Sequence, residues 1–247
     1  MRLNVVPAAS ALLAASLFAV SALPTQAGDA AAFDPIGFSE DGRYFAYEEY
    51  GIQDGSGFVF DTIYLVDLIE DKWVGSPVRV LVEDETARLS AVRAEAMARA
   101  KPMLDKVALV NAPEIILLNA DGEVGVNGME VSFGSLGNGL SAPSEVWSLK
   151  LDTFESTTKE PCASYGMEEP VKGFALTLTV DNGDSAEIHR DASVPASRGC
   201  VSDYRIHAVV GPFYWGFNAS PLVAVVSVYS LGFEGPNRRF VTVPIVP

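Results

Sequence analysis

The chain has 247 residues, 49% of them hydrophobic, and carries 32 Asp and Glu residues against 17 Lys and Arg residues, a formal net charge of −15. An apolar fraction of this size excludes an intrinsically disordered chain. A pI near 4.4 argues against general nucleic-acid binding, because an acidic surface repels the phosphate backbone.

Residues 1–27 have the pattern of a secretory signal peptide. Arg2 is their only charged residue, an apolar stretch over residues 5–23 follows, and small residues lead up to Ala27. Signal peptidase recognises this order of features. The alternative is an uncleaved anchor, since the stretch is nearly long enough to span a bilayer, but it is rich in Ala and no basic cluster flanks it. We expect cleavage after Ala27, with Ala30 as a second candidate, and no membrane span in the mature chain.

Residues 28–247 are expected to form a single, mainly β domain, because no linker or low-complexity segment interrupts them. Asp41-Gly42 is a hairpin signal in front of an aromatic strand. We expect residues 43–50 to pair antiparallel with residues 60–68 and residues 51–59 to form an exposed loop. Both faces of the first strand carry apolar side chains, which is typical of an inner strand.

Over residues 84–106 the spacing of apolar residues changes from the alternation of a strand to the three-to-four-residue spacing of a helix. Pro102 should kink or end this helix, and Asp84 or Thr86 could cap its start. The segment is locally basic, and we expect it to dock on the acidic strands of the same chain; an external partner is the alternative. The apolar residues at helical spacing are Leu89, Val92, Ala96, Ala100 and Leu104.

The rest of the chain has the short alternating segments and turn signals of β-structure. The expected fold is therefore mainly β, with antiparallel sheets that are blade-like or form a sandwich and one long α-helix near residues 84–106; an α+β fold is the alternative. The further strands are expected at residues 77–82, 114–118, 124–126, 129–133, 146–151, 174–180, 185–189, 204–210, 222–229 and 240–245.

Cys162 and Cys200 are the only cysteines in the sequence. In an exported protein a disulfide between them is the default. A redox-active pair is the alternative, but such pairs usually have the C-x-x-C spacing that is absent here. We expect a structural disulfide.

Signatures of catalysis and metal binding are sparse. His189 and His207 are the only histidines, without the spacing of a zinc site, and His189 is expected to face solvent without partners. Acidic turns at residues 119–123 and 181–184 hold oxygen ligands suited to Ca²⁺, but hairpin turns use the same residue types. Ser156 begins an S-x-x-K string, yet it lacks the helix and the K-T-G motif of penicillin-binding enzymes. We assign no catalytic residue, no metal site and no cofactor.

The sequence resembles two known families, one over a short segment near the start of the mature chain and one over most of the mature chain. The run F-S-E-D-G-R-Y-F-A-Y from residue 38, with I-Y-L-V-D-L at residues 63–68, resembles one blade repeat of TolB-like β-propellers. Together with the signal peptide, D-G-S-G at residues 54–57, Lys72-Trp73, R-G-C at residues 198–200, D-Y-R-I at residues 203–206 and S-L-G-F-E-G-P at residues 230–236, the first run resembles a bacterial family of predicted secreted proteins, a domain of unknown function. The second resemblance implies export and a bacterial origin, and it supplies no activity.

The densest aromatic run is the candidate partner-binding segment: Phe213, Tyr214, Trp215 and Phe217. Exposed aromatic residues anchor partners, although such a run more often forms a loop over the core. The leading hypothesis is a non-catalytic periplasmic or secreted binding protein, whose partner is a protein or a small-molecule ligand. The alternatives are an envelope hydrolase and a structural partner in an envelope assembly.

The signal peptide gives the first testable prediction. N-terminal sequencing of the exported protein should begin at Gly28, because the small-residue site ends at Ala27. An exported protein that still begins at Met1 would contradict the prediction.

Overall fold

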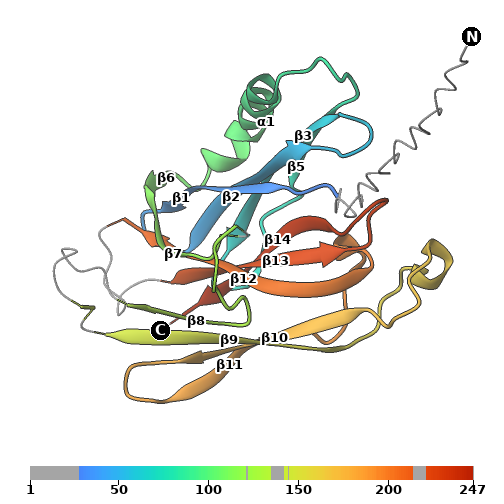
Figure 1. Cartoon of the computed structure of the whole chain (residues 1–247). Coiled ribbons are helices and arrows are strands. Elements are labelled where there is room, and N and C mark those ends of the chain that lie inside the picture. Colours follow the sequence, from blue (N-terminus) through green and yellow to red (C-terminus); the bar gives the residue numbers. More distant parts are fainter. Residues whose placement is uncertain (1–27, 121, 135–141, 144, 214–220, 247) are drawn as a thin grey trace, which may run out of the picture.

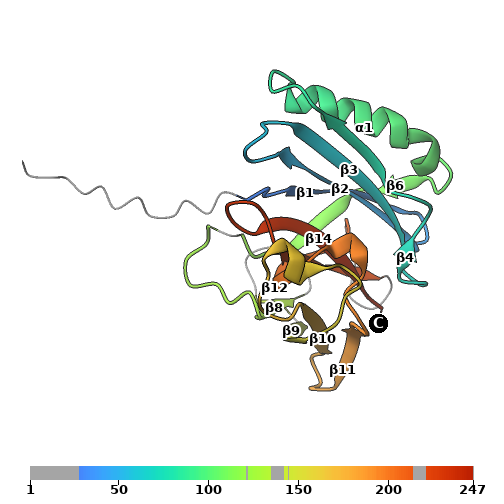
Figure 2. The same ribbon diagram turned by 90° about the vertical axis from the view of Figure 1, so that its right-hand side faces the viewer.

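The computed structural model describes residues 28–120, 122–134, 142–143, 145–213 and 221–246. In this part of the chain three antiparallel β-sheets and an α-helix are stacked in four layers, with the helix on one outer side (Figures 1 and 2). The mainly β fold predicted from the sequence is confirmed. The sheets lie face to face, which is the sandwich arrangement of the two that were expected.

The helix-covered sheet has the strand order β4-β3-β2-β1-β6, with β5 paired to β3 beside β4. It contains β1 (Ala32–Ser39), β2 (Tyr44–Ile52), β3 (Val59–Asp67), β4 (Lys72–Trp73), β5 (Val78–Val82) and β6 (Leu109–Asn111). The helix α1 (Leu89–Leu104) lies across its outer face.

The central sheet has the order β14-β13-β12-β7, and the outer sheet the order β11-β10-β9-β8. The central sheet contains β7 (Pro113–Leu118), β12 (Val201–Pro212), β13 (Leu222–Ser230) and β14 (Asn237–Ile245). The outer sheet contains β8 (Glu130–Gly134), β9 (Val146–Glu155), β10 (Lys172–Thr179) and β11 (Ser185–Arg190), and two short 3₁₀ helices, η1 (Cys162–Tyr165) and η2 (Ala196–Arg198), lie in its connections.

The hairpin predicted near the start of the mature chain is confirmed. β2 pairs with β3 from Tyr44 opposite Asp67 to Ile52 opposite Val59. The turn before β2 places Gly42 at φ 71°, a conformation that glycine adopts without steric cost. The pairing extends further than expected, because Val59 is a buried strand residue and not part of an exposed loop.

All nine residues of β3 are buried, because both faces of the strand are covered by other layers. Phe60, Tyr64 and Val66 point towards the central sheet, where they join one hydrophobic cluster, whereas Ile63 and Leu65 join the cluster beneath α1. Side chains of a strand alternate between the two faces of its sheet. β3 therefore links the helix layer to the central sheet.

The predicted helix is confirmed, with tighter bounds than residues 84–106. Val92, Ala96, Ala100 and Leu104 are its buried residues, and Pro102 lies in its last turn. The predicted caps were wrong: the N-cap is Arg88 without a side-chain cap bond. Asp84 instead accepts hydrogen bonds from Thr86 in the turn before the helix, at 2.8 and 2.7 Å.

The helix docks on the acidic strands of its own chain, as its charge indicated. Arg93 donates to Asp34 Oδ2 at 2.7 Å and also pairs with Glu48. Its guanidinium lies over the ring of Tyr50, 3.9 Å from the centroid. Among the described residues, Arg93 thus makes the ion pairs that join the helix to β1 and β2.

The strand expected at residues 124–126 is absent from the described structure, and this prediction was wrong. These residues form turns, with Gly125 at φ 83° and the side chain of Val124 98% exposed. Since no neighbouring strand covers Val124, its hydrophobicity has no sheet face to join.

Asp61 is a fully buried carboxyl group on the face of β3 that lies under α1. Neither of its oxygens has a hydrogen-bond partner among the described residues. Burial, and then the nearby carboxylate of Glu48, raise the pKa of Asp61 to about 8. A neutral Asp61 is therefore favoured in the folded protein at pH 7.

This carboxyl group predicts a pH dependence of stability. An unfolded chain ionises Asp61 near its ordinary pKa of 3.8, whereas the folded chain keeps the proton up to about pH 8. Between these values unfolding releases a proton, so Asp61 lowers stability as the pH rises, by at most about 1.4 kcal/mol per pH unit. Asp61→Asn should reduce that slope and be more stable than the wild type at pH 8, as measured by urea unfolding.

Asp67→Asn on the same strand is the matched control. Its ion pair with Arg43, at 2.6 Å, lowers the pKa of Asp67, so this substitution should destabilise the protein at pH 7. An Asp61→Asn variant with an unchanged pH slope would refute the assignment.

Candidate functional site

A cleft lies between the helix-covered sheet and the central sheet. It encloses about 1010 Å³, at the upper end of the range for small-molecule sites. It opens where the edge strands of the two sheets, β4 and β5 on one side and β14 on the other, face solvent. Residues of η1, η2 and the loop after β13 also line it, among them Tyr165, Arg198, Gly199, Leu231 and Phe233.

Glu49 and Tyr64 form the polar floor of the cleft. The Tyr64 hydroxyl donates to Glu49 Oε1 at 2.6 Å, and the backbone N–H of Phe240 donates to Glu49 Oε2 at 3.1 Å. Because Phe240 belongs to β14, one buried carboxyl group joins the two sheets. Burial raises the pKa of Glu49, against the hydrogen bond from Tyr64, so this group holds its proton more readily than an exposed glutamate.

A second polar group lies next to the outer sheet, where His189 and Arg198 line the cleft and Asp191 is buried behind it. Asp191 accepts hydrogen bonds from Arg198 Nη1 at 2.8 Å and from the backbone N–H of Phe174 at 3.1 Å, and its Oδ1 lies 3.1 Å from His189 Nε2. Burial raises the pKa of Asp191, but these partners outweigh burial and the net pKa is lowered. Asp191 is thus stabilised as an anion.

The prediction that His189 faces solvent without partners was wrong. Its ring stacks on Phe174, with the centroids 4.5 Å apart, and it bonds Asp191. Its Nδ1 lies 4.0 Å from the carboxylate of Asp71, which belongs to the β3–β4 turn of the helix-covered sheet. Sequence spacing could not indicate this, because Asp71 reaches His189 only across the cleft.

The rim of the cleft carries exposed aromatic side chains. Trp73 is 41% exposed, Tyr165 60% and Phe233 96%, and all three line the cleft. The Trp73 ring also packs against Tyr64 on the floor, with centroids 5.3 Å apart. Exposed apolar residues gathered around a cleft mark ligand or partner sites more often than scattered ones do.

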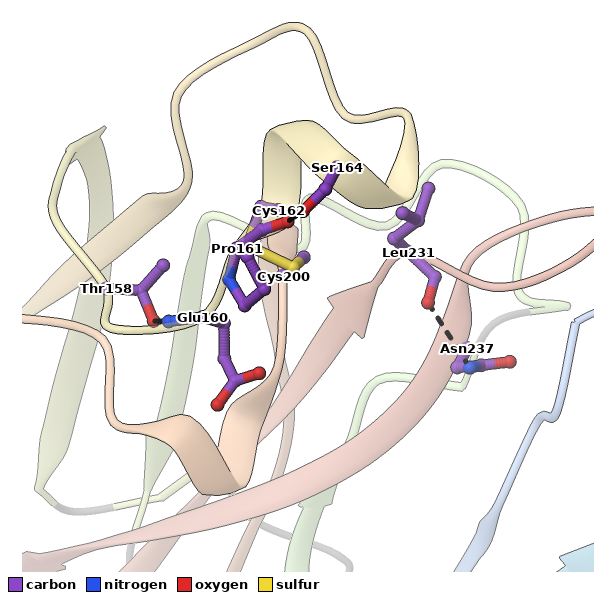
Figure 3. The surroundings of a disulfide bond; sticks show 8 residues. All are labelled: Thr158, Glu160, Pro161, Cys162, Ser164, Cys200, Leu231 and Asn237. Atoms are coloured by element: carbon purple, nitrogen blue, oxygen red, sulfur yellow. Dashed lines mark hydrogen bonds between the residues drawn. A yellow bond between two sulfur atoms is a disulfide. The ribbon is translucent and has the colours of Figure 1, made fainter.

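The predicted disulfide between Cys162 and Cys200 is confirmed, with the two Cα atoms 5.5 Å apart. It ties η1 to the segment between η2 and β12 (Figure 3). The neighbouring loop is held by Asn237, whose side chain donates to the backbone oxygen of Leu231 at 3.4 Å. Since Tyr165 follows Cys162 and Arg198 precedes Cys200, the disulfide braces one wall of the cleft.

The other residues singled out in the sequence lie away from this cleft or outside the described residues. Phe213 directly follows β12 and is 55% exposed. Tyr214, Trp215 and Phe217 lie outside the described residues. Ser156 follows β9 without a helix, and its backbone N–H donates to Val171 O. The acidic segment at residues 181–184 is a turn, in which Asn182 and Asp184 bond each other.

Most residues that line the cleft carry no recognisable signal in the sequence. Glu49, Tyr64 and Arg79 are ordinary strand residues, and no local spacing distinguishes them. Phe233 could have been recognised from the sequence. It is an aromatic residue between Gly232 and Gly235, in a turn where a bulky side chain has little core to pack against.

These observations define the class of the protein: an antiparallel β-sandwich with a disulfide-braced cleft that opens to solvent. The chain belongs to the family of predicted secreted proteins DUF2259, whose model matches residues 46–245. The resemblance recognised in the sequence is thereby confirmed. A search of curated proteins finds no match. Among the described residues, no helix is long and apolar enough to cross a membrane.

The disulfide yields a stability prediction. The Cys162→Ala/Cys200→Ala double variant should lose about 4 kcal/mol of unfolding free energy, because the closed loop no longer restricts the unfolded chain. Urea unfolding of the variant, and of the wild type with and without reductant, measures this loss. Reactive thiols in the oxidised wild type, or a variant as stable as the wild type, would contradict it.

Proposed function

We propose that this protein is a non-catalytic binding protein, exported by the bacterium, whose ligand occupies the cleft between the helix-covered and central sheets. The single observation that carries the proposal is the ring of exposed aromatic side chains, Trp73, Tyr165 and Phe233, around a cleft of about 1010 Å³. Large exposed apolar side chains are costly in water, and a bound ligand would cover them.

The polar groups of the cleft support binding over catalysis. Glu49 already accepts two hydrogen bonds that hold the sheets together, and Asp191 is occupied by Arg198, His189 and a backbone N–H. Among the described residues, no serine, threonine or cysteine side chain bonds His189, so the geometry offers no activated nucleophile. Both carboxyl groups act in the architecture of the cleft.

The proposal includes the fate of the chain. Residues 1–27 are removed on export, with cleavage after Ala27, and residues 28–247 form a single domain in the periplasm or outside the cell. The signal-peptide pattern and the disulfide support an oxidising destination.

The aromatic run from Phe213 is a second proposed partner surface. The observation that favours it is the 55% exposure of Phe213 at the end of the central sheet, away from the residues that line the cleft. An exposed phenylalanine of this kind suits a protein partner.

Binding of the neutral fluorescent dye phenylnaphthylamine tests the cleft. We expect one dye per folded chain, with fluorescence enhancement on binding. Trp73→Ala and Phe233→Ala should each weaken the affinity by about fivefold or more, since each removes an aromatic contact. Fluorescence titration gives the dissociation constants.

Val124→Ala is the control, because it removes an exposed apolar side chain outside the cleft and should leave dye affinity unchanged. Near-ultraviolet circular dichroism verifies that each variant is folded. No dye binding to the folded wild type, or equal affinity in all variants, would overturn the proposed role of the cleft.

A further inference from the structure

We propose that the cleft selects an organic anion, an aromatic ring system bearing a carboxylate, sulfonate or phosphate group, with Arg79 and Arg239 as the anion-recognising residues. This inference rests on the proposed binding function and adds the chemistry of the ligand. It comes from the charges of the cleft, the geometry of the two arginines and the position of the aromatic rim.

The charge of the cleft differs in sign from that of the whole protein. The chain has 17 Lys and Arg residues against 32 Asp and Glu residues. The residues that line the cleft include four cations, Lys72, Arg79, Arg198 and Arg239, against three acids, Glu49, Asp71 and Glu160. Glu49 is buried and already bonded, so it contributes least to the repulsion of an anion.

Two of these cations have carboxylate partners within 3.0 Å. Arg198 donates to both oxygens of Asp191 at 2.8 Å, and Lys72 pairs with Glu70 at 3.0 Å. Neither is available to a ligand without breaking an ion pair. Their role is to shape the walls.

Arg79 is different, because it is exposed and has no ion pair or side-chain hydrogen bond within the described part of the chain. Its position on β5 places it directly opposite Thr62 of β3, on the face of the sheet that lines the cleft. An arginine fork presents several donors in a geometry that matches carboxylate, sulfonate and phosphate oxygens.

Arg239 approaches the same place from β14 of the central sheet. Its guanidinium lies over the ring of Phe60, 4.5 Å from the centroid, while its Nη1 donates to the backbone oxygens of Asp29 and Arg238. These bonds hold the side chain in place, and its ion pair with Asp29 is longer than those of Lys72 and Arg198, with Asp29 Oδ2 3.5 Å from Nη2.

The two arginines converge on one part of the cleft. Phe60 and Thr62 are alternate residues on β3 and share a face, so the residue opposite Thr62 lies diagonally next to Phe60. Arg79 and Arg239 therefore flank Phe60 from two different sheets. Both charges also act to lower the pKa of Glu49, which places both within electrostatic range of the floor.

The aromatic rim determines the other half of the ligand. A small inorganic anion would leave Trp73, Tyr165 and Phe233 exposed, whereas a ring bearing an anionic group would pack against them while its charge reaches the arginines. Charge complementarity and apolar contact together indicate an aromatic anion.

Two dyes that differ in one sulfonate test the inference. Phenylnaphthylamine is neutral, and anilinonaphthalene sulfonate is the same ring system with a sulfonate group. We expect the wild type to bind the anionic dye about tenfold more tightly than the neutral one, and this preference to shrink at high salt. Arg79→Gln should remove most of the preference and leave the affinity for the neutral dye unchanged.

Two further variants, Arg79→Lys and Arg99→Gln, test whether the preference for the anionic dye depends on the arginine at position 79. Arg79→Lys keeps the positive charge and should retain part of the preference. Arg99 lies on α1, paired with Glu95 and outside the cleft, so Arg99→Gln lowers the net positive charge equally and should retain the full preference. Arg239→Gln, if folded by circular dichroism, should reduce the preference as Arg79→Gln does.

The outcomes separate the two proposals. Equal binding of the two dyes, or a preference that survives Arg79→Gln, overturns the anion selectivity while neutral-dye binding in the cleft still supports the binding function. Failure of the folded wild type to bind either dye overturns both.

Discussion

The strand β13 of the central sheet is buried on both of its faces from Leu222 to Val228, and the arrangement of the other layers follows from this constraint. On β13, Val223 and Val225 face the helix-covered sheet, while Ala224 and Val226 face the outer sheet. A strand buried on both sides needs an apolar partner layer on each side. The helix-covered sheet supplies one partner, and its own second face is then closed by α1.

The outer sheet ends the stack because its strands alternate in polarity. Along β9, Trp147, Leu149 and Leu151 are buried, while Lys150 and Asp152 are exposed. One face of this sheet is therefore satisfied by water, and no further layer is required.

The cleft is a consequence of the same stacking. Twisted sheets that pack face to face diverge towards their corners, and the edge strands β5 and β14 both line the cleft. An open sheet edge exposes unpaired backbone groups, and Glu49 satisfies one of them by accepting the N–H of Phe240. Stability and the shape of the proposed site thus depend on the same carboxyl group.

The sequence predicted the fold better than the site because strand signals are local. The aromatic strand at residues 44–50 and the glycine-containing loop after it contain enough information for the β2–β3 hairpin, which the structure confirms. The Asp41-Gly42 turn joins β1 to β2. Where the pattern depended on an unseen neighbour it failed, as at Val124, whose hydrophobic side chain meets no sheet.

The site residues failed to stand out for the same reason. Arg79 and Arg239 lie on strands that are distant in the sequence and belong to different sheets. Each resembles an ordinary surface arginine until the sheets are stacked. The disulfide was predictable because two cysteines in an exported chain leave one pairing.

An anion site in a protein of net charge −15 requires that short-range contacts outweigh long-range repulsion. Exposed charges more than about 10 Å apart are largely screened at 0.1 M salt, so the remote acids weigh little on a ligand already in the cleft. Ion pairs of the proposed ligand with Arg79 and Arg239 would act at contact distance, where salt screens them least. The acidic exterior slows the approach of every anion, and a small anion gains no apolar contact after it arrives. On the proposed function, the aromatic rim and the arginines therefore act as two requirements, and a ligand that meets both of them binds more tightly than one that meets only one.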